Sequence, residues 1–202
     1  MAEIVSEQHM LGGMRAETWE RDPRHVAFMS ARYMFVAKML EGKRSVLEVG
    51  CGDGFGARIV RQHVQNLTGI DLDPVSIREA MKNYSATWPV KFLVYDIMDG
   101  ALPGFDAVYC LDVFEHIEDE HSLLGNLRGC APVCIIGTPS LESQAYACEG
   151  SKAGHVNCVT KGQLRERMQR HWKHVFMFGM NDSTLHTGHD GMTHYLLGMG
   201  CA

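Results

Sequence analysis

The 202-residue sequence has no long apolar run and no surplus of basic residues. A membrane-spanning helix needs roughly 18–20 apolar residues, and no run comes close to that length. The first ten residues, MAEIVSEQHM, have neither the basic start nor the apolar block of a secretory signal. The formal net charge of −5 gives no broad basic footprint, which argues against generic nucleic-acid binding. We therefore expect a cytoplasmic protein that neither spans a membrane nor binds nucleic acid.

Regularly paired cysteines are also missing. The seven cysteines are an odd number, scattered without the spacing of a disulfide framework, so we expect reduced thiols. Two looser groups contain residue types that bind metals, but neither has the pairing of a structural zinc site, so we predict no metal. These groups are His186, His189, Asp190 and His194, and Cys148, His155 and Cys158.

Internal repeats and low-complexity linkers are absent as well, and the 46% of hydrophobic residues is ordinary for a globular protein. A chain of this length can bury one core, so we expect one domain over residues 1–202. Within it we expect an N-terminal helical cap segment over 1–42 and a core over 43–202. Apolar runs alternate with amphipathic segments, which predicts βαβ units, a parallel sheet and an α/β fold.

Seven strands are expected in this fold. Five follow βα order, and two more form a terminal antiparallel hairpin; they cover 45–49, 67–71, 90–96, 105–112, 131–139, 174–181 and 192–200. Asp22 with Pro23, and Asp73 with Pro74, predict helix starts, and Thr160 with Gln163 predicts a capping box. A further helix is expected over about 55–64. Residues 140–159 lack periodicity and are expected to form a long loop with room for a short helix.

Four carboxylates stand at or next to the carboxyl ends of consecutive predicted strands: Glu48, Asp71, Asp96 and Asp112. In an open α/β sheet, ligands bind in the crevice beyond those ends. Any one of these residues could simply cap a helix. Four of them beside a glycine-rich loop favour a ligand site.

The glycine-rich stretch VLEVGCGDGFG, residues 46–56, differs from a dinucleotide-binding loop. Gly50 and Gly52 fit the G-x-G-x-x-G pattern, but Phe55 takes the third glycine's place. Asp71, 21 residues beyond Gly50, suits a carboxylate that binds ribose hydroxyls. Glu48 and Asp53 would repel a diphosphate and would favour a nucleoside that carries positive charge. S-adenosylmethionine is such a molecule.

The chain resembles the class I S-adenosylmethionine-dependent methyltransferases from Val46 to about Met199. The motifs that carry the resemblance are VLEVGCGDGFGARIV, GIDLDPVSIREA, VYDIMDGALPGFDAVYCLDVFEHIED and GTPS with GHVNCVTKGQLRERM. The last of these is similar to small-molecule members. The resemblance implies a doubly wound, seven-stranded Rossmann-like sheet of order 3-2-1-4-5-7-6, with the last strand antiparallel and helices on both faces.

The resemblance also implies roles for residues that bind the cofactor. Gly50, Gly52, Glu48 and Asp53 would lie near the methionine part, and Asp71 would accept hydrogen bonds from both ribose hydroxyls. Leu72 and Ile97 would contact adenine, Asp96 its amino group, and the backbone at Leu111, with Asp112, the ammonium end. Arg32 could pair with the cofactor's carboxylate, or it could be an ordinary surface arginine.

Two histidines are candidates for acceptor chemistry. His116, just after the fourth predicted strand, could act as a general base or could be structural. His155, with Asn157 in the GHVN loop, could line the acceptor pocket or tie the loop to the sheet.

The sequence does not identify the methyl acceptor. The leading hypothesis is transfer to an oxygen or nitrogen atom of a sugar, nucleotide-sugar, lipid-precursor or quinone-like molecule. Methylation of RNA or protein is an alternative, although the Asn/Asp-Pro-Pro-Tyr motif of many nucleic-acid amino methylases is absent. A second alternative function is that of a catalytically silent partner subunit, and a remote one is that of an oxidoreductase. The sequence also leaves open whether the protein forms a homodimer.

Overall fold

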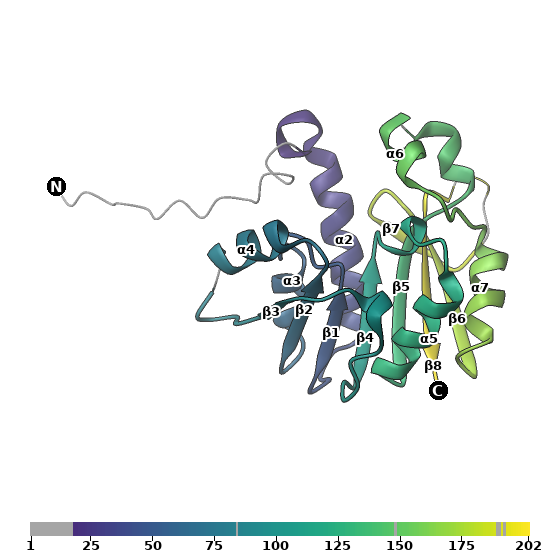
Figure 1. Ribbon diagram of the computed structural model, residues 1–202. Coiled ribbons are helices and arrows are strands. Elements are labelled where there is room, and N and C mark those ends of the chain that lie inside the picture. The colour runs from purple at the N-terminus through teal and green to yellow at the C-terminus, as the bar shows by residue number, and fades with distance from the viewer. Residues whose placement is uncertain (1–17, 84, 148, 189–190, 192) are drawn as a thin grey trace.

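A computed structural model describes residues 18–83, 85–147, 149–188, 191 and 193–202 (Figure 1). The strands are β1 Val46–Val49, β2 Leu67–Asp71, β3 Lys91–Val94, β4 Ala107–Leu111, β5 Val133–Pro139, β6 His174–Asn181, β7 Thr184–His186 and β8 Tyr195–Cys201. The helices are α2 Pro23–Met39, α3 Ala57–Arg61, α4 Pro74–Lys82, α5 Glu120–Cys130, α6 Glu149–Gly154 and α7 Lys161–Gln169. Three short 3₁₀ segments are η1 Ile97–Asp99, η2 Phe114–His116 and η3 Glu142–Tyr146.

The strands form one mixed sheet of order β3-β2-β1-β4-β5-β8-β6-β7. Strands β1 to β5 are parallel to their neighbours, and β8 lies between β5 and β6, antiparallel to both. The seven expected strands correspond to β1–β6 and β8, and their expected order is confirmed, as is the antiparallel last strand. The expected number is corrected, because the sheet has an eighth strand, β7, at its edge.

Strand β7 is three residues long and pairs with β6 through a two-residue turn, with Asn181 opposite Thr184. Asp182 in that turn has φ +53°, the left-handed conformation that a tight antiparallel turn requires. A strand of three residues has too little alternation to stand out in the sequence.

Local capping signals account for several helix starts. The Asp22 and Asp73 side chains accept backbone N–H bonds at the starts of α2 and α4, each followed by a proline. Thr160 and Gln163 form the expected reciprocal capping box of α7. Helix α3 is shorter than the expected 55–64. The Arg61 guanidinium donates to the Val64 carbonyl, so this carbonyl just after α3 is bonded to a side chain.

Two apolar clusters lie on opposite faces of the sheet. One packs α5 and α7 against the sheet through Leu127 and Met168, and the other packs α2 and α3 through Val36 and Val60. Each face is thus covered by helices, as a doubly wound sheet requires (Figure 1). None of the helices within the described ranges has the length and apolar character needed to cross a membrane.

Candidate cofactor and acceptor site

The four predicted carboxylates lie at or near the carboxyl ends of the parallel strands. Glu48 is buried within β1, and Asp71 ends β2. Asp96 caps η1 just after β3, where its Oδ1 accepts from the Met98 N–H at 2.8 Å. Asp112 directly follows β4. Parallel pairing places the carboxyl ends of β1, β2 and β4 together, so these residues border the same crevice.

The glycine-rich loop folds over the end of β2. The N–H groups of Gly50 and Cys51 both donate to the Ile70 carbonyl, at 2.8 and 3.0 Å. Gly50 and Gly52 have φ of +75° and +53°, which side chains rarely adopt. A Cβ atom at Gly52 would meet nothing within 4 Å, so the backbone there faces open space. The loop can therefore present its main chain directly to a ligand.

Asp71 has a second task that the sequence does not reveal. Its Oδ2 accepts from the Gly52 N–H at 2.8 Å, and its Oδ1 accepts from the Asp73 N–H at 2.9 Å. The carboxylate therefore fixes the glycine loop to the end of β2. Each carboxylate oxygen has a second lone pair, so both can still accept a hydrogen bond from a ribose hydroxyl.

The electrostatics of the loop favour a cation. Burial, followed by the charges of Glu48 and Asp71, raises the pKa of the Cys51 thiol far above its ordinary value. Burial and Glu48 likewise raise the pKa of the Tyr109 hydroxyl. The loop sequence GCGDGFG, residues 50–56, contains no lysine or arginine to offset this negative charge. A diphosphate would be repelled here, and a sulfonium or ammonium group would be attracted.

The surroundings fit an adenosine moiety. Leu72, directly after Asp71, is 67% exposed although it is apolar, and it offers a surface for a flat ring. Ile97 is buried behind the crevice, and Asp96 is half-buried beside it. Carboxylates for hydroxyl and amino groups, apolar side chains for the base and open glycine backbone together match S-adenosylmethionine.

Asp112 forms an ion pair with Arg32 from α2. Arg32 Nη1 lies 3.1 Å from both carboxylate oxygens of Asp112, and the guanidinium stacks 3.7 Å from the centre of the Tyr195 ring. Asp112 has φ +56°, a conformation that aspartate tolerates better than most residues. Within the described residues, the buried Arg32 Nε has no hydrogen-bond partner.

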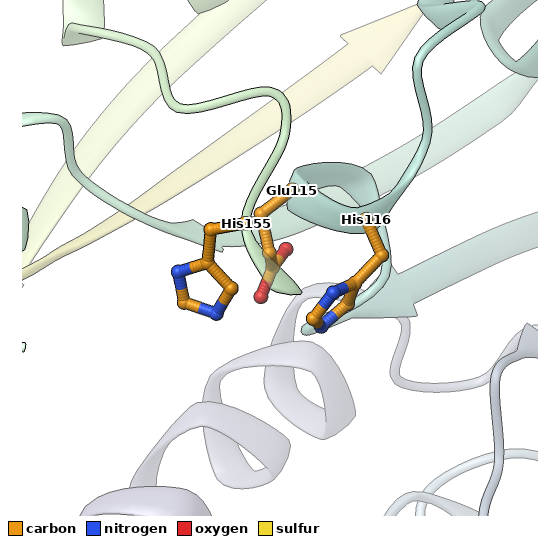
Figure 2. Close-up of side chains that lie close together, drawn as sticks. All are labelled: Glu115, His116 and His155. Carbon is orange, nitrogen blue, oxygen red and sulfur yellow. The ribbon is translucent and has the colours of Figure 1, made fainter. Parts of the chain in front are cut away.

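His116 and His155 lie face to edge, with ring centres 5.1 Å apart. Figure 2 shows that the side chain of Glu115 points between them. Glu115 is 1% exposed, and its Oε2 accepts from the Thr138 hydroxyl at 3.0 Å. Burial, followed by the charge of Asp112, raises the pKa of Glu115 to about 7. Glu115 is missing from the sequence-predicted residues, although it directly precedes His116 in the FEHIED motif.

Comparison with known proteins establishes the family. The pattern of the methyltransferase domain family matches residues 46–131. An uncharacterized methyltransferase of Mycobacterium tuberculosis is 31% identical over 141 residues, which cover 66% of this chain and 67% of that protein. The chain belongs to the class I S-adenosylmethionine-dependent methyltransferases.

Solved structures support the fold of the methyltransferase. Magnesium protoporphyrin IX methyltransferase from Synechocystis PCC 6803, with bound SAH, superposes with a TM-score of 0.71, covers 94% of both chains and is 16% identical. Small RNA methyltransferase HEN1 gives a TM-score of 0.68 at 17% identity, over 84% of this chain and 24% of that one. At such identities the likeness concerns the fold, and the methyltransferase family indicates S-adenosylmethionine as the cofactor.

A cavity of about 280 Å³ opens beside this site in the methyltransferase. Helix α2 forms one wall and η3, with His155 from the loop after α6, forms another; α2 and η3 both extend beyond the carboxyl ends of the parallel strands (Figure 1). Its lining includes Phe28, Arg32, Tyr146, His155 and Tyr195. His155 therefore faces the cavity. Asn157 instead ties the loop down, because its Oδ1 accepts from Arg167.

The sequence-predicted residues thus fall into three groups. Glu48, Gly50, Gly52, Asp53, Asp71 and Leu111 lie at or near the ends of β1, β2 and β4, and Leu72, Asp96 and Ile97 adjoin β2 and β3. Asp112 and Arg32 are bonded to each other, and His116 and His155 are neighbours. Three residues of the two looser metal-like groups, Cys148, His189 and Asp190, lie outside the described residues, as does the cap segment before residue 18.

Proposed function

We propose that this methyltransferase methylates an oxygen or nitrogen atom of a small-molecule acceptor held in the cavity beside His155. The cavity itself is the observation that carries this proposal. Its volume of about 280 Å³ lies near the lower end of the range of small-molecule sites. Its aromatic lining, from Phe28, Tyr146 and Tyr195, suits a compact and partly apolar acceptor.

The geometry supports the following roles, which we propose for the residues of the cofactor site. Asp71 would accept from the ribose hydroxyls with its remaining lone pairs, while its bonds to Gly52 and Asp73 hold it in position. Leu72 and Ile97 would flank the base, and Asp96 would accept from its amino group. The Arg32 guanidinium, which lines the cavity, would meet the cofactor's carboxylate. Bound S-adenosylmethionine supplies a methyl group already activated by the positive sulfur.

The chain's own contribution is alignment and exclusion of water. Helix α2 and η3 wall the cavity, and the Arg32–Asp112 pair links α2 to the end of β4. His116 and His155 each hold a proton on Nδ1 toward an oxygen acceptor, so Nε2 has a lone pair. An acceptor hydroxyl that must lose its proton would find a base there.

Cofactor binding is tested by calorimetric titration with S-adenosylhomocysteine. Asp71→Ala is expected to abolish measurable binding, because it removes the ribose acceptor and also frees the Gly52 loop. Asp99→Ala, an exposed aspartate in the nearby η1, is the matched control and should bind like the parent protein. Equal affinity of parent and Asp71→Ala protein would contradict the Asp71 assignment.

The acceptor class is tested with methyl-labelled S-adenosylmethionine. The protein is incubated separately with filtered metabolites and with RNA from the same cells. We expect label in the metabolite fraction, because the small, aromatic-lined cavity suits a compact acceptor. Label confined to RNA would contradict this proposal and favour the alternative, methylation of RNA, which is the activity in the name of HEN1.

A further inference from the structure

We propose that Glu115, His116 and His155 form a binding site for a divalent transition-metal ion. Each of the three offers one ligand atom, and these atoms lie within 4.8 Å of one another. They come from η2 and from the loop after α6, about forty residues apart in the chain. Among the described residues, this is the one group of three or more such side chains that meets this separation.

Both imidazoles are already oriented as metal ligands. His116 Nδ1 lies 2.8 Å from the Gly154 carbonyl, and His155 Nδ1 lies 3.1 Å from Gln144 Oε1. Both partners are oxygen acceptors, so Nδ1 carries the proton and Nε2 presents its lone pair. Metal-bound histidines in proteins are held in this way, with the second ring nitrogen donating to an oxygen.

Hydrogen bonds to its main chain and side chain fix the position of Glu115, the carboxylate ligand. The Glu115 main-chain carbonyl accepts from the N–H groups of Val156 and Asn157, at 2.9 and 3.0 Å. These bonds hold the loop that carries His155 against η2. The Thr138 hydroxyl, from β5, donates to Oε2 and orients the carboxylate. Three separate elements therefore set the position of one buried acid.

The three side chains present a buried anion and two neutral donor atoms to the same point. The Glu115 carboxylate lies between two imidazoles whose Nε2 atoms have lone pairs, with the charges of Asp112 and Arg32 nearby. Buried charge is usually paired or bound to a metal.

The ligand set selects the kind of ion. Two imidazole nitrogens and one carboxylate oxygen suit Zn²⁺, Mn²⁺ or Fe²⁺, whereas Mg²⁺ and Ca²⁺ prefer oxygen ligands alone. Tetrahedral ligands at about 2.1 Å from zinc lie about 3.4 Å apart, so three ligand atoms 4.8 Å apart would each move inward by about 0.8 Å. Three protein ligands leave a coordination position open.

The open position gives the ion a role that rests on the proposed function. His155 lines the acceptor cavity, so the open position lies at its wall. With the ion bound, the Nε2 lone pairs of His116 and His155 are occupied, so the ion takes over from these histidines as the group that activates the acceptor. A hydroxyl oxygen of the acceptor bound to the ion would have a lowered pKa and would release its proton to solvent. The metal would thus hold and acidify the oxygen that is methylated.

The experiment measures metal binding directly. Protein without a histidine tag is stripped with a chelator and titrated calorimetrically with Zn²⁺, Mn²⁺ and Mg²⁺. We expect one equivalent of Zn²⁺ or Mn²⁺ to bind at least tenfold more tightly than Mg²⁺. Glu115→Gln, His116→Gln and His155→Gln should each lower the Zn²⁺ affinity at least tenfold. No stoichiometric binding by the parent protein overturns the site.

His121→Gln is the matched control. His121 and His171 are also 5.1 Å apart between ring centres, but they belong to no metal-ligand group of the described residues. The control should bind Zn²⁺ like the parent protein, and an equal loss in His121→Gln would overturn the assignment. His155→Gln, in a half-buried loop, tests the site even if Glu115→Gln fails to fold.

Titration with S-adenosylhomocysteine separates this proposal from the function on which it rests. The three ligand variants are expected to bind it as the parent does. Metal binding without S-adenosylhomocysteine binding would contradict the proposed function and leave the metal site standing. The reverse result would overturn the metal site alone.

Discussion

At the scale of single residues, Arg32 connects three parts of the molecule. It lies in α2, pairs with Asp112 after β4 and stacks on Tyr195 at the start of β8. Its side chain is 14% exposed, whereas that of Asp112 is 43% exposed. The guanidinium is shielded from solvent and Asp112 is its direct ion-pair partner, so the pair should contribute more than an ordinary surface ion pair.

A double-mutant cycle measures the pair. Arg32→Met and Asp112→Asn should each lower the free energy of unfolding by about 1–3 kcal/mol, with a coupling of about 1–2 kcal/mol. Asparagine tolerates the positive φ at 112, so the cycle does not include a backbone penalty. Urea unfolding of the four proteins gives the values, and a coupling near zero would show that the pair is merely a surface contact.

At the scale of elements, α2 and the glycine loop are packed in direct contact. A Cβ atom at Gly56 would overlap the Tyr33 ring, so this glycine lets α2 lie close against the start of α3. Tyr33 also makes an edge contact with Tyr109 of β4, at 6.5 Å between ring centres. One wall of the cavity is therefore positioned by the same loop that we propose faces the cofactor.

Gly56→Ala tests this contact. Overpacking should cost about 1–3 kcal/mol, which lowers the Tm by several degrees for a protein of this size. Gly125→Ala is the control, because it lies inside α5 with its nearest neighbour at 4.0 Å. That variant should raise the unfolding free energy by about 0.5–1 kcal/mol. Equal Tm values for the two variants, measured by circular dichroism, would refute the contact.

The elements also show what the sequence can predict. Capping at Asp73 and Thr160 depends on neighbours within three residues, so those helix starts are readable from the chain. The partners of Glu115 and Arg32 lie 23 residues away at Thr138 and 80 residues away at Asp112. No local pattern encodes such contacts, because they arise from strand order. The Glu115 cluster and the Arg32–Asp112 pair therefore needed the structure, whereas the acidic strand ends did not.

At the scale of the whole molecule, the sheet buries most of its thiols. Cys51, Cys110, Cys130 and Cys134 are buried, and Cys158 and Cys201 are half-buried. Cys148 lies outside the described residues. Burial raises the pKa of the Cys134 thiol well above its ordinary value, which suppresses the reactive thiolate.

Thiol counting checks this arrangement. With a disulfide reagent at pH 8, the unfolded chain should titrate seven thiols and the native protein at most three. The difference reflects the packed sheet, because buried thiols react only when the structure opens. Native protein that reacts at all seven positions, at the rate of the unfolded chain, would contradict the described core.

Strand β8 lies between two strands that precede it in the chain. During synthesis, β5 and β6 emerge from the ribosome before the segment that must separate them, so both carry unpaired edges for that interval. The apolar side chains of β8, among them Leu196 and Leu197, are needed to complete both cores. This half of the sheet can therefore fold completely only after β8 has left the ribosome. Until then, the exposed strand edges are surfaces that a chaperone could bind.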